Sequence, residues 1–217
     1  MTSLTFAVPK GRILKELQPL LKRAGLVPEA DFFDEHSRKL EFKTNVAGLS
    51  IIRVRSFDVA TFVAFGAAQL GVAGSDVLME FDFPDIYAPL DLGIGKCRLS
   101  VAGLEKQDGK DDPARWSHIT IATKYPNITR NYFAARGVQA ECIKLSGAME
   151  LAPKLGLCRH IVDLVSTGAT LKANGLTELE KITDVSSRLI INRTAFKTRS
   201  EEISIWINRF KEAVHGT

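Results

Sequence analysis

The sequence predicts an α/β protein built from two units, each with its own mainly parallel sheet. One observation is a regular alternation of short apolar runs with helical repeats, which begins at Leu4. Another is that this alternation starts again at His118, after the polar, loop-like stretch Glu105–Arg115. A third is the apolar stretch Ile182–Ile191, which can return the chain to the first unit. The predicted division is 1–92 plus 184–217 for the first unit and 93–183 for the second.

Composition is that of a globular protein. The 217 residues are 45% hydrophobic and 25% charged, which excludes disordered and fibrous classes. No apolar run reaches the ~20 residues that span a bilayer, and the N-terminus does not resemble a secretory signal, so we expect a cytoplasmic protein without membrane contact. A net charge of +4 without a long basic block suits anionic small molecules better than nucleic acid. The scattered cysteines and histidines predict neither a disulfide framework nor a protein-bound metal.

The first unit opens with a strand at Leu4–Val8, a turn carrying Lys10 and Arg12, and a helix that ends at Gly25. Two cations at a helix N-terminus interact unfavourably with the helix dipole, which costs roughly a few tenths of a kcal/mol or more. An anion between them would remove this penalty, and Gly11 would let such a ligand approach. We therefore favour an anion site here over a pair of solvated surface charges.

The rest of the first unit follows the same alternation. Asp76 is ambiguous, because Ser75 and Asp76 can form an N-cap pair for a helix that begins at Val77. The same residue also ends a central strand, where ligands collect in open α/β sheets. The expected strands are Leu40–Lys43, Leu49–Val54, Leu70–Gly74 and Tyr87–Leu92, with a helix after Arg55.

In the second unit a buried strand breaks into a hydroxyl-rich turn and then a short helix start. Backbone N–H groups of Thr167, Gly168, Ala169 and Thr170 are expected to lie unpaired in the turn, beside the hydroxyls of Ser166, Thr167 and Thr170. A phosphate monoester fits such a turn, with Gly168 at positive φ. Asp163 precedes the turn and is suited to ribose hydroxyls. The alternative is an ordinary strand, turn and helix with capping hydroxyls.

The remaining elements of the second unit complete the alternation. The expected strands are Lys96–Leu104, His118–Thr123, Gln139–Leu145 and His160–Val165, and the expected helices are Pro126–Arg136, Ala148–Leu155 and Ala169–Asn174. The final helix of the chain carries Ile203, Trp206, Ile207, Phe210 and Val214 on one side. We interpret these as core residues, with partner contact as the alternative.

Several segments together resemble the ATP phosphoribosyltransferase family. They fall in the family's order and cover nearly the whole chain, so the combination is specific although each motif alone is weak. The segments are Val8–Ile13, Ser37–Leu40, Gly71–Leu78, Ala122–Tyr125, Lys144–Pro153 and Val162–Leu171.

The resemblance implies the type II periplasmic-binding-protein fold, with two α/β lobes and a central cleft that a substrate with phosphates at both ends would bridge. It implies that N1 of ATP attacks C1 of 5-phosphoribosyl 1-pyrophosphate, giving N1-(5-phosphoribosyl)-ATP and pyrophosphate in the first step of histidine biosynthesis. The chain resembles the short form of the family, since it ends after the helix near His215.

Roles at matching positions follow from the same resemblance. The loop residues Asp163, Ser166, Thr167, Gly168, Ala169 and Thr170 are expected to hold the ribose and 5′-phosphate. The cations Lys10, Arg12, Arg38 and Arg55 are expected around the pyrophosphate and ATP phosphates, with Arg12 and Arg38 catalytic. Glu150 and Asp76 match polar positions that contact nucleotide. Arg53 lies so close to Arg55 that their individual roles stay open.

Mg²⁺ is expected to bind mainly through substrate phosphates. The implied partner is a regulatory subunit that resembles histidyl-tRNA synthetase, in a hetero-octamer, and the catalytic chain itself is expected to form a homodimer. Two alternatives remain. One is a solute-binding module of the same fold without catalysis, which the missing signal and the cations disfavour. The other is a transcriptional effector domain, which would need a DNA-binding module.

Overall fold

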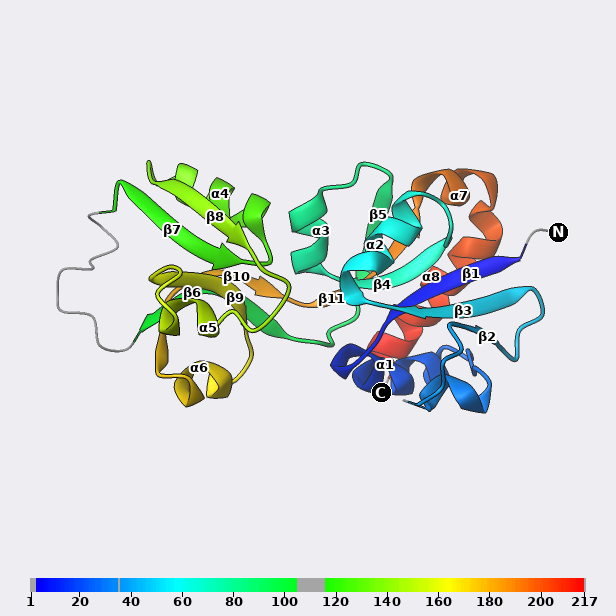
Figure 1. Cartoon of the computed structure of the whole chain (residues 1–217). Coiled ribbons are helices and arrows are strands. Elements are labelled where there is room, and N and C mark those ends of the chain that lie inside the picture. The colour runs from blue at the N-terminus through cyan, green and yellow to red at the C-terminus, as the bar shows by residue number, and fades with distance from the viewer. Residues whose placement is uncertain (1–2, 35, 105–115, 217) are drawn as a thin grey trace. The chain divides into compact units, whose positions relative to one another are not determined.

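The structure is a computed structural model that describes residues 3–34, 36–104 and 116–216. It divides into two compact units, drawn together in Figure 1. Unit 1 comprises Met1–Leu78, Asp82–Gly95 and Ser186–Thr217, and unit 2 comprises Met79–Phe81 and Lys96–Val185. The boundaries thus differ from the predicted 92/93 and 183/184, and Met79–Phe81 belong to unit 2. The predicted loop Glu105–Arg115 lies outside the described residues.

Unit 1 has a sheet in the strand order β2-β3-β1-β4-β11-β5 (Figure 1). Its strands are β1 (Leu4–Pro9), β2 (Glu41–Lys43), β3 (Leu49–Val54), β4 (Leu70–Gly74), β5 (Ile86–Asp91) and β11 (Ser187–Asn192). Its helices are α1 (Arg12–Arg23), the 3₁₀ helix η1 (Ala30–Phe33), α2 (Ser56–Ala64), α3 (Ser75–Phe81, whose end belongs to unit 2), α7 (Arg193–Thr198) and α8 (Ser200–His215).

Unit 2 has a sheet in the order β10-β6-β9-β7-β8. Its strands are β6 (Cys97–Leu104), β7 (His118–Thr123), β8 (Gln139–Lys144), β9 (His160–Val165) and β10 (Leu176–Val185), and its helices are α4 (Pro126–Ala134), α5 (Leu151–Lys154) and α6 (Ala169–Ala173). Strand β10 begins well before the predicted Ile182, and α5 is shorter than predicted because Ala148 has a left-handed φ of 53°.

The prediction of mainly parallel sheets is wrong for both units. In unit 1, β1 pairs in parallel with β3 and β4, but β2, β11 and β5 pair antiparallel with their neighbours. In unit 2, β7 is parallel to β8 and β9, whereas β6 is antiparallel to β9 and β10. Parallel pairing needs a crossover, usually a helix, whereas antiparallel neighbours can be joined by a short loop, as β2 and β3 are. Strands β5 and β11, which pair antiparallel in unit 1, each connect to a strand of unit 2, because β5 is followed by β6 and β11 follows β10 after Ser186 alone.

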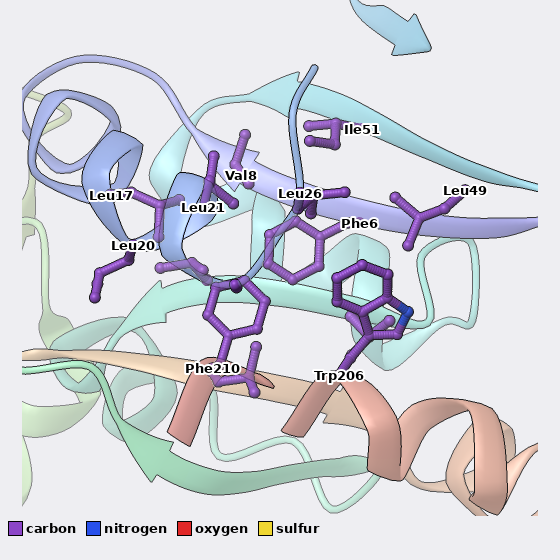
Figure 2. Close-up of a cluster of buried hydrophobic side chains, with 14 of the residues drawn as sticks. Phe6, Val8, Leu17, Leu20, Leu21, Leu26, Leu49, Ile51, Trp206 and Phe210 are labelled. Atoms are coloured by element: carbon purple, nitrogen blue, oxygen red, sulfur yellow. The ribbon is translucent and has the colours of Figure 1, made fainter. Parts of the chain in front are cut away.

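The core of unit 1 follows the two-residue period of β1. Leu4, Phe6 and Val8 are buried on the face covered by α1 and α8, while Ala7 packs on the opposite face with residues of α2. Figure 2 shows Phe6 beside Phe210, whose ring stacks on it at 5.5 Å between centroids. The interpretation of the final helix as a core helix is confirmed, because Ile203, Trp206 and Phe210 are buried.

In unit 2 the two faces of the sheet have different covers. Ala102, Ile161 and Val165 pack with buried residues of α5 and α6, among them Ala152 and Leu171. Helix α4 packs along β8, with Ile128 and Phe133 buried. None of the helices within the described ranges has the length and apolar character that a membrane crossing requires.

Candidate functional site

The loop that follows β9 forms one wall of a pocket of about 280 Å³ in unit 2. Glu150 reaches the pocket from the N-cap position of α5, and Asp163 from the last part of β9. The structure therefore brings together every residue of unit 2 that the sequence predicted as substrate-binding. The lining consists of Glu150, Asp163, Leu164, Val165, Ser166, Thr167, Gly168, Ala169, Thr170 and Leu171.

Most of the predicted hydrogen-bonding character of this loop is present. Gly168 has a positive φ of 77°, as predicted, and a residue with a side chain would be strained in this conformation. The N–H groups of Thr167, Gly168 and Thr170 have no acceptor within the described ranges. The N–H of Ala169 is an exception, because the hydroxyl of Thr167 accepts it at 3.3 Å. Helix α6 has only five residues, so the loop offers a ligand these N–H groups and hydroxyls more than the dipole of a long helix.

A side-chain cluster at the edge of this loop was not predicted from the sequence. Arg98 on β6 donates from Nη1 to the carbonyl oxygen of Ser166 at 3.1 Å. It also donates from Nε to Oε1 of Glu178 at 2.6 Å and from Nη2 to Oε2. Ser100 donates to the same Oε1 at 2.7 Å. We call Arg98, Ser100 and Glu178 the clamp.

The clamp is electrostatically coupled. The hydrogen bonds from Arg98 lower the pKa of the Glu178 carboxyl, and the same contact raises the pKa of the Arg98 guanidinium. The sequence feature that could have indicated the clamp was a charged residue, Arg98, inside the predicted strand Lys96–Leu104. Its partner Glu178 lies on β10, far along the chain, and no local pattern connects them.

In unit 1 the predicted residues follow the carboxyl ends of the parallel strands β3, β1 and β4. Lys10 follows β1, and its N–H donates to the carbonyl oxygen of Val54, the last residue of β3, at 3.0 Å. Arg55 comes next along the chain and occupies the N-cap position of α2. Asp76 lies in the first turn of α3, after β4. The same edge of the sheet therefore carries Lys10, Arg55 and Asp76, as the fold class leads one to expect.

A larger pocket of about 610 Å³ opens beside the N-terminus of α1. Lys10 is the one predicted cation that lines it; Arg12, Arg38 and Arg55 are exposed and lie outside its lining. The lining residues are Lys10, Gly11, Leu14, Lys15, Gln18, Phe33, Ser37 and Arg53. Arg12 forms an ion pair with Glu16, 3.7 Å from Nε to Oε1. Glu16 also accepts the N–H of Gly95 at 2.7 Å, so the position of its carboxylate does not depend on Arg12 alone.

The structure separates Arg53 from Arg55. Arg53 is only 5% exposed and donates to the carbonyl oxygens of Phe32, Asp34 and Ser37 at 2.7, 2.9 and 3.1 Å. Its guanidinium carbon also lies 5.0 Å from the centroid of a buried phenylalanine ring. The guanidinium of Arg53 is therefore occupied by backbone carbonyls, whereas the exposed Arg55 is available to a ligand.

Arg38 extends from a segment that is held on both sides. Arg53 bonds the carbonyl of Ser37, the residue before it. Lys39, the residue after it, bonds Glu29 at 2.5 Å between Nζ and Oε1, and this hydrogen bond lowers the pKa of the Glu29 carboxyl. Arg38 itself is exposed. The backbone is thus fixed while the guanidinium points to solvent, which suits a residue that contacts a ligand.

The N-cap interpretation of Ser75 and Asp76 is wrong. Gly74 is the N-cap of α3, and it has no side chain to cap with, so Ser75 begins the helix. Asp76 is 5% exposed, and its carboxylate lies so close to Gly74 that a Cβ there would come within 2.0 Å of Oδ1. Any side chain at Gly74 would therefore displace the Asp76 carboxylate, and the assignment of Asp76 to nucleotide binding stays a prediction.

The carboxylates of the described residues do not form a metal cage. No group of three or more His, Cys, Asp or Glu side chains in these ranges is placed to hold a metal ion. The pocket of unit 2 carries Asp163 and Glu150 beside hydroxyls and backbone N–H groups. This donor set fits a phosphate ester better than a bare cation, and any Mg²⁺ would have to bring most of its ligands with it.

Two α/β units, each with a mixed sheet and with a pocket beside the loop that follows one of its parallel strands, form an α/β protein of the periplasmic-binding-protein type. The fold is similar to that of a ligand-binding component of an ABC-type import system from Staphylococcus aureus, solved with zinc bound (TM-score 0.59, 9% identity, 98% of this chain and 74% of the other). This likeness supports the predicted fold class.

The family is shown by sequence. The family model described as ATP phosphoribosyltransferase matches residues 55–212. The ATP phosphoribosyltransferase of Rhodospirillum rubrum is 69% identical over 97% of this chain and 92% of its own length. That of Paramagnetospirillum magneticum is 66% identical over 98% and 97%. The ATP phosphoribosyl transferase (HisG:HisZ) complex from Thermotoga maritima contains a chain with TM-score 0.82 and 30% identity, with 99% and 100% coverage. The chain belongs to the ATP phosphoribosyltransferase family, whose reaction is the first step of histidine biosynthesis.

Proposed function

We propose that the chain transfers the phosphoribosyl group of 5-phosphoribosyl 1-pyrophosphate to N1 of ATP, with the loop 166–170 as the site of the 5′-phosphate. The observation that carries this assignment is the pocket of unit 2, which gathers all the predicted ribose and phosphate residues on one wall. Its N–H groups and hydroxyls offer several donors to a phosphate within one short loop. Asp163, at the start of that wall, offers a carboxylate to ribose hydroxyls.

The chemistry is a displacement at C1 of the ribose. The lone pair of adenine N1 forms the new bond to C1, and the C1–O bond to pyrophosphate breaks with its electron pair leaving on the pyrophosphate. Cationic character grows on the ribose and negative charge grows on the leaving group. Catalysis therefore needs orientation of N1 and stabilisation of the departing pyrophosphate, more than a strong general base.

The cations of unit 1 suit the second of these needs. Arg12, at the start of α1, and Arg38, next to the carbonyl held by Arg53, are both exposed. Arginine stays ionised and can bind a phosphate through two N–H groups at once. We assign both to the pyrophosphate leaving group, and Lys10 and Arg55 to the phosphates of the substrates. Glu150 and Asp76 are assigned to nucleotide contacts.

Mg²⁺ is proposed to bind through the phosphates of the substrates, where it would neutralise part of their charge. A carboxylate cage is not needed for that role, because Mg²⁺ keeps several waters and takes phosphate oxygens readily. Asp163 and Glu150 are the acids of the unit 2 pocket that a phosphate-bound ion would meet.

The partner proposals rest on the family. The structure from Thermotoga maritima is a HisG:HisZ complex, which supports a HisZ-type regulatory partner for this chain in a hetero-oligomer. A hetero-octamer and a homodimer of the catalytic chain are the finer assignments, and the cytoplasm is the proposed location.

The test is an ultraviolet assay of phosphoribosyl-ATP formation with purified protein, both substrates and Mg²⁺, coupled to pyrophosphatase. The expected result is a signal that requires ATP and 5-phosphoribosyl 1-pyrophosphate together. Ligand binding without any turnover, in the presence of the regulatory subunit as well, would instead support a binding module of the same fold.

A further inference from the structure

We propose that Arg98 is a positioning residue for the loop 166–170, which we call the phosphate loop, and that Glu178 and Ser100 hold Arg98 in place for this role. The proposal rests on the proposed function, because that function assigns the loop to the phosphate of 5-phosphoribosyl 1-pyrophosphate. Arg98 lies on β6 directly opposite Val165, the last residue of β9. Its side chain therefore starts beside the point where the loop begins.

The decisive contact is the hydrogen bond from Nη1 of Arg98 to the carbonyl of Ser166. A trans peptide is planar, and its C=O and N–H point in opposite directions. A donor that fixes the carbonyl of Ser166 on one side therefore fixes the N–H of Thr167 on the other. That N–H has no acceptor in the described part of the chain. Arg98 thus orients a donor that the phosphate would use, without contacting the phosphate itself.

Glu178 makes this orientation well defined. Nε and Nη2 of Arg98 are occupied by the two oxygens of Glu178, so Nη1 is the nitrogen left for the loop. The planar fork of a guanidinium sets the angle between these contacts, which an ammonium group cannot do. Because Glu178 balances the charge of Arg98, the clamp acts on the loop through geometry more than through added positive charge.

The clamp also borders the predicted ribose acid. Ser100 lies directly opposite Asp163 across β6 and β9, so the two side chains are on the same face of the sheet. Ser100 donates to Glu178, which arrives from β10 where the register shifts between Glu178 and Glu180. Residues of three strands therefore meet at one point, next to both the phosphate loop and Asp163.

The experiment compares Arg98→Met with Arg136→Met in the full chain. Arg136 is a matched control, because it also pairs with a glutamate of β10, Glu180, at 3.4 Å but does not touch the loop. Arg98→Met is expected to raise the Kd and KM for 5-phosphoribosyl 1-pyrophosphate about tenfold and to change the KM for ATP less than about twofold. Arg136→Met should leave both constants unchanged. Calorimetry supplies the Kd and the coupled assay supplies the KM values.

Two further variants separate positioning from general loss of structure. Arg98→Lys keeps the charge without the fork and should remain closer to Arg98→Met than to the parent. Glu178→Gln keeps one acceptor oxygen, which can still serve Nε of Arg98 and Ser100, but it loses the acceptor of Nη2. A smaller rise of about threefold is expected for the same substrate alone. Parent-like constants for 5-phosphoribosyl 1-pyrophosphate in Arg98→Met, or an equal rise for ATP, would overturn the proposal. A parent chain without turnover would instead count against the proposed function.

Discussion

Each unit uses an arginine to bond backbone carbonyls beside its candidate site, but the two arginines are placed differently. Arg53 of unit 1 is buried and bonds carbonyls within the segment that carries Arg38. Arg98 of unit 2 is partly exposed and divides its guanidinium between one loop carbonyl and Glu178. In both units, an arginine that is suited to phosphate is instead occupied by the protein's own groups.

The difference shows what each site presents to a ligand. Unit 1 fixes the backbone and leaves cations such as Arg12 and Arg38 exposed, so its attraction for anions is electrostatic and weakened by salt. Among the described residues, the lining of the unit 2 pocket includes no lysine or arginine, and it presents N–H groups and hydroxyls in a set geometry. We expect the arginines of unit 1 to stabilise the growing charge of the leaving group, and the donors of unit 2 to anchor a phosphate that keeps its charge.

The largest effect should come from removing an exposed cation of unit 1. Arg12→Ala and Arg38→Ala are each expected to lower kcat roughly 100-fold, and to raise the KM for ATP much less, because the lost contact is strongest when pyrophosphate departs. The fold should survive in Arg12→Ala, since Glu16 keeps the N–H of Gly95. Steady-state kinetics with Lys22→Ala, an exposed cation farther along α1, is the control. Unchanged turnover in both arginine variants would remove the assignment to the leaving group.

Substitution of Arg53 should affect mainly the stability of the fold, and substitution of Arg55 should affect mainly substrate binding. Arg53→Met is expected to lower the free energy of unfolding by at least ~2 kcal/mol, because the buried carbonyl of Phe32 and the partly buried carbonyl of Asp34 lose their donor. Arg55→Met should change it by less than ~0.5 kcal/mol while weakening substrate binding. Urea denaturation and kinetics on the same two preparations give both quantities. If Arg55→Met destabilised the fold and Arg53→Met did not, their roles would have to be exchanged.

The loop 166–170 shows how much of the candidate site the sequence could predict. Its residues are consecutive, so the change from apolar strand to hydroxyl-rich turn revealed the loop and Gly168 together. The elements were predictable for the same reason, since β3, β4, β7 and β9 begin and end where the local patterns indicate. Pairing direction was not, because it depends on how distant strands meet.

The roles of Arg98 and Arg53 could not be predicted from the sequence. Both look like cations available to a phosphate until their partners are known, and those partners are backbone carbonyls or a glutamate from a distant strand. Carbonyl acceptors carry no residue signature, so no pattern could assign them. The N-cap error at Ser75 has a related cause, because a cap is defined by backbone conformation, which Gly74 adopts instead.

The hydroxyls of the loop should have an intermediate effect. Thr170→Val is expected to weaken binding of 5-phosphoribosyl 1-pyrophosphate by ~1–3 kcal/mol, through a lost hydrogen bond to a charged group. Thr167→Val should weaken it similarly, and it also removes the acceptor of the Ala169 N–H. Calorimetry measures the affinity, with Thr177→Val on an exposed position of β10 as the control. Normal affinity in both loop variants would exclude the loop from the site.

The smallest effect concerns acid and the clamp of unit 2. The pKa of Glu178 is lowered by Arg98, so its ionised form stabilises the fold at pH values above its ordinary pKa of 4.5. This contribution is lost as the pH falls through the lowered pKa. Glu178→Gln should therefore reduce the acid dependence of the unfolding midpoint below pH 4.5, slightly, since the side chain is 26% exposed and water screens the pair.

Protonation of Glu178 should also affect the loop 166–170, through Arg98. Protonated Glu178 holds the guanidinium less firmly, so affinity for 5-phosphoribosyl 1-pyrophosphate should fall in acid more steeply in the parent than in Glu178→Gln. ATP affinity should follow one curve in both proteins, because the cations assigned to it in unit 1 do not contact Glu178. Calorimetry at a series of pH values compares the four curves. Coincident curves for 5-phosphoribosyl 1-pyrophosphate would mean that the charge of Glu178 has no part in holding the loop, and that its hydrogen bonds alone set Arg98.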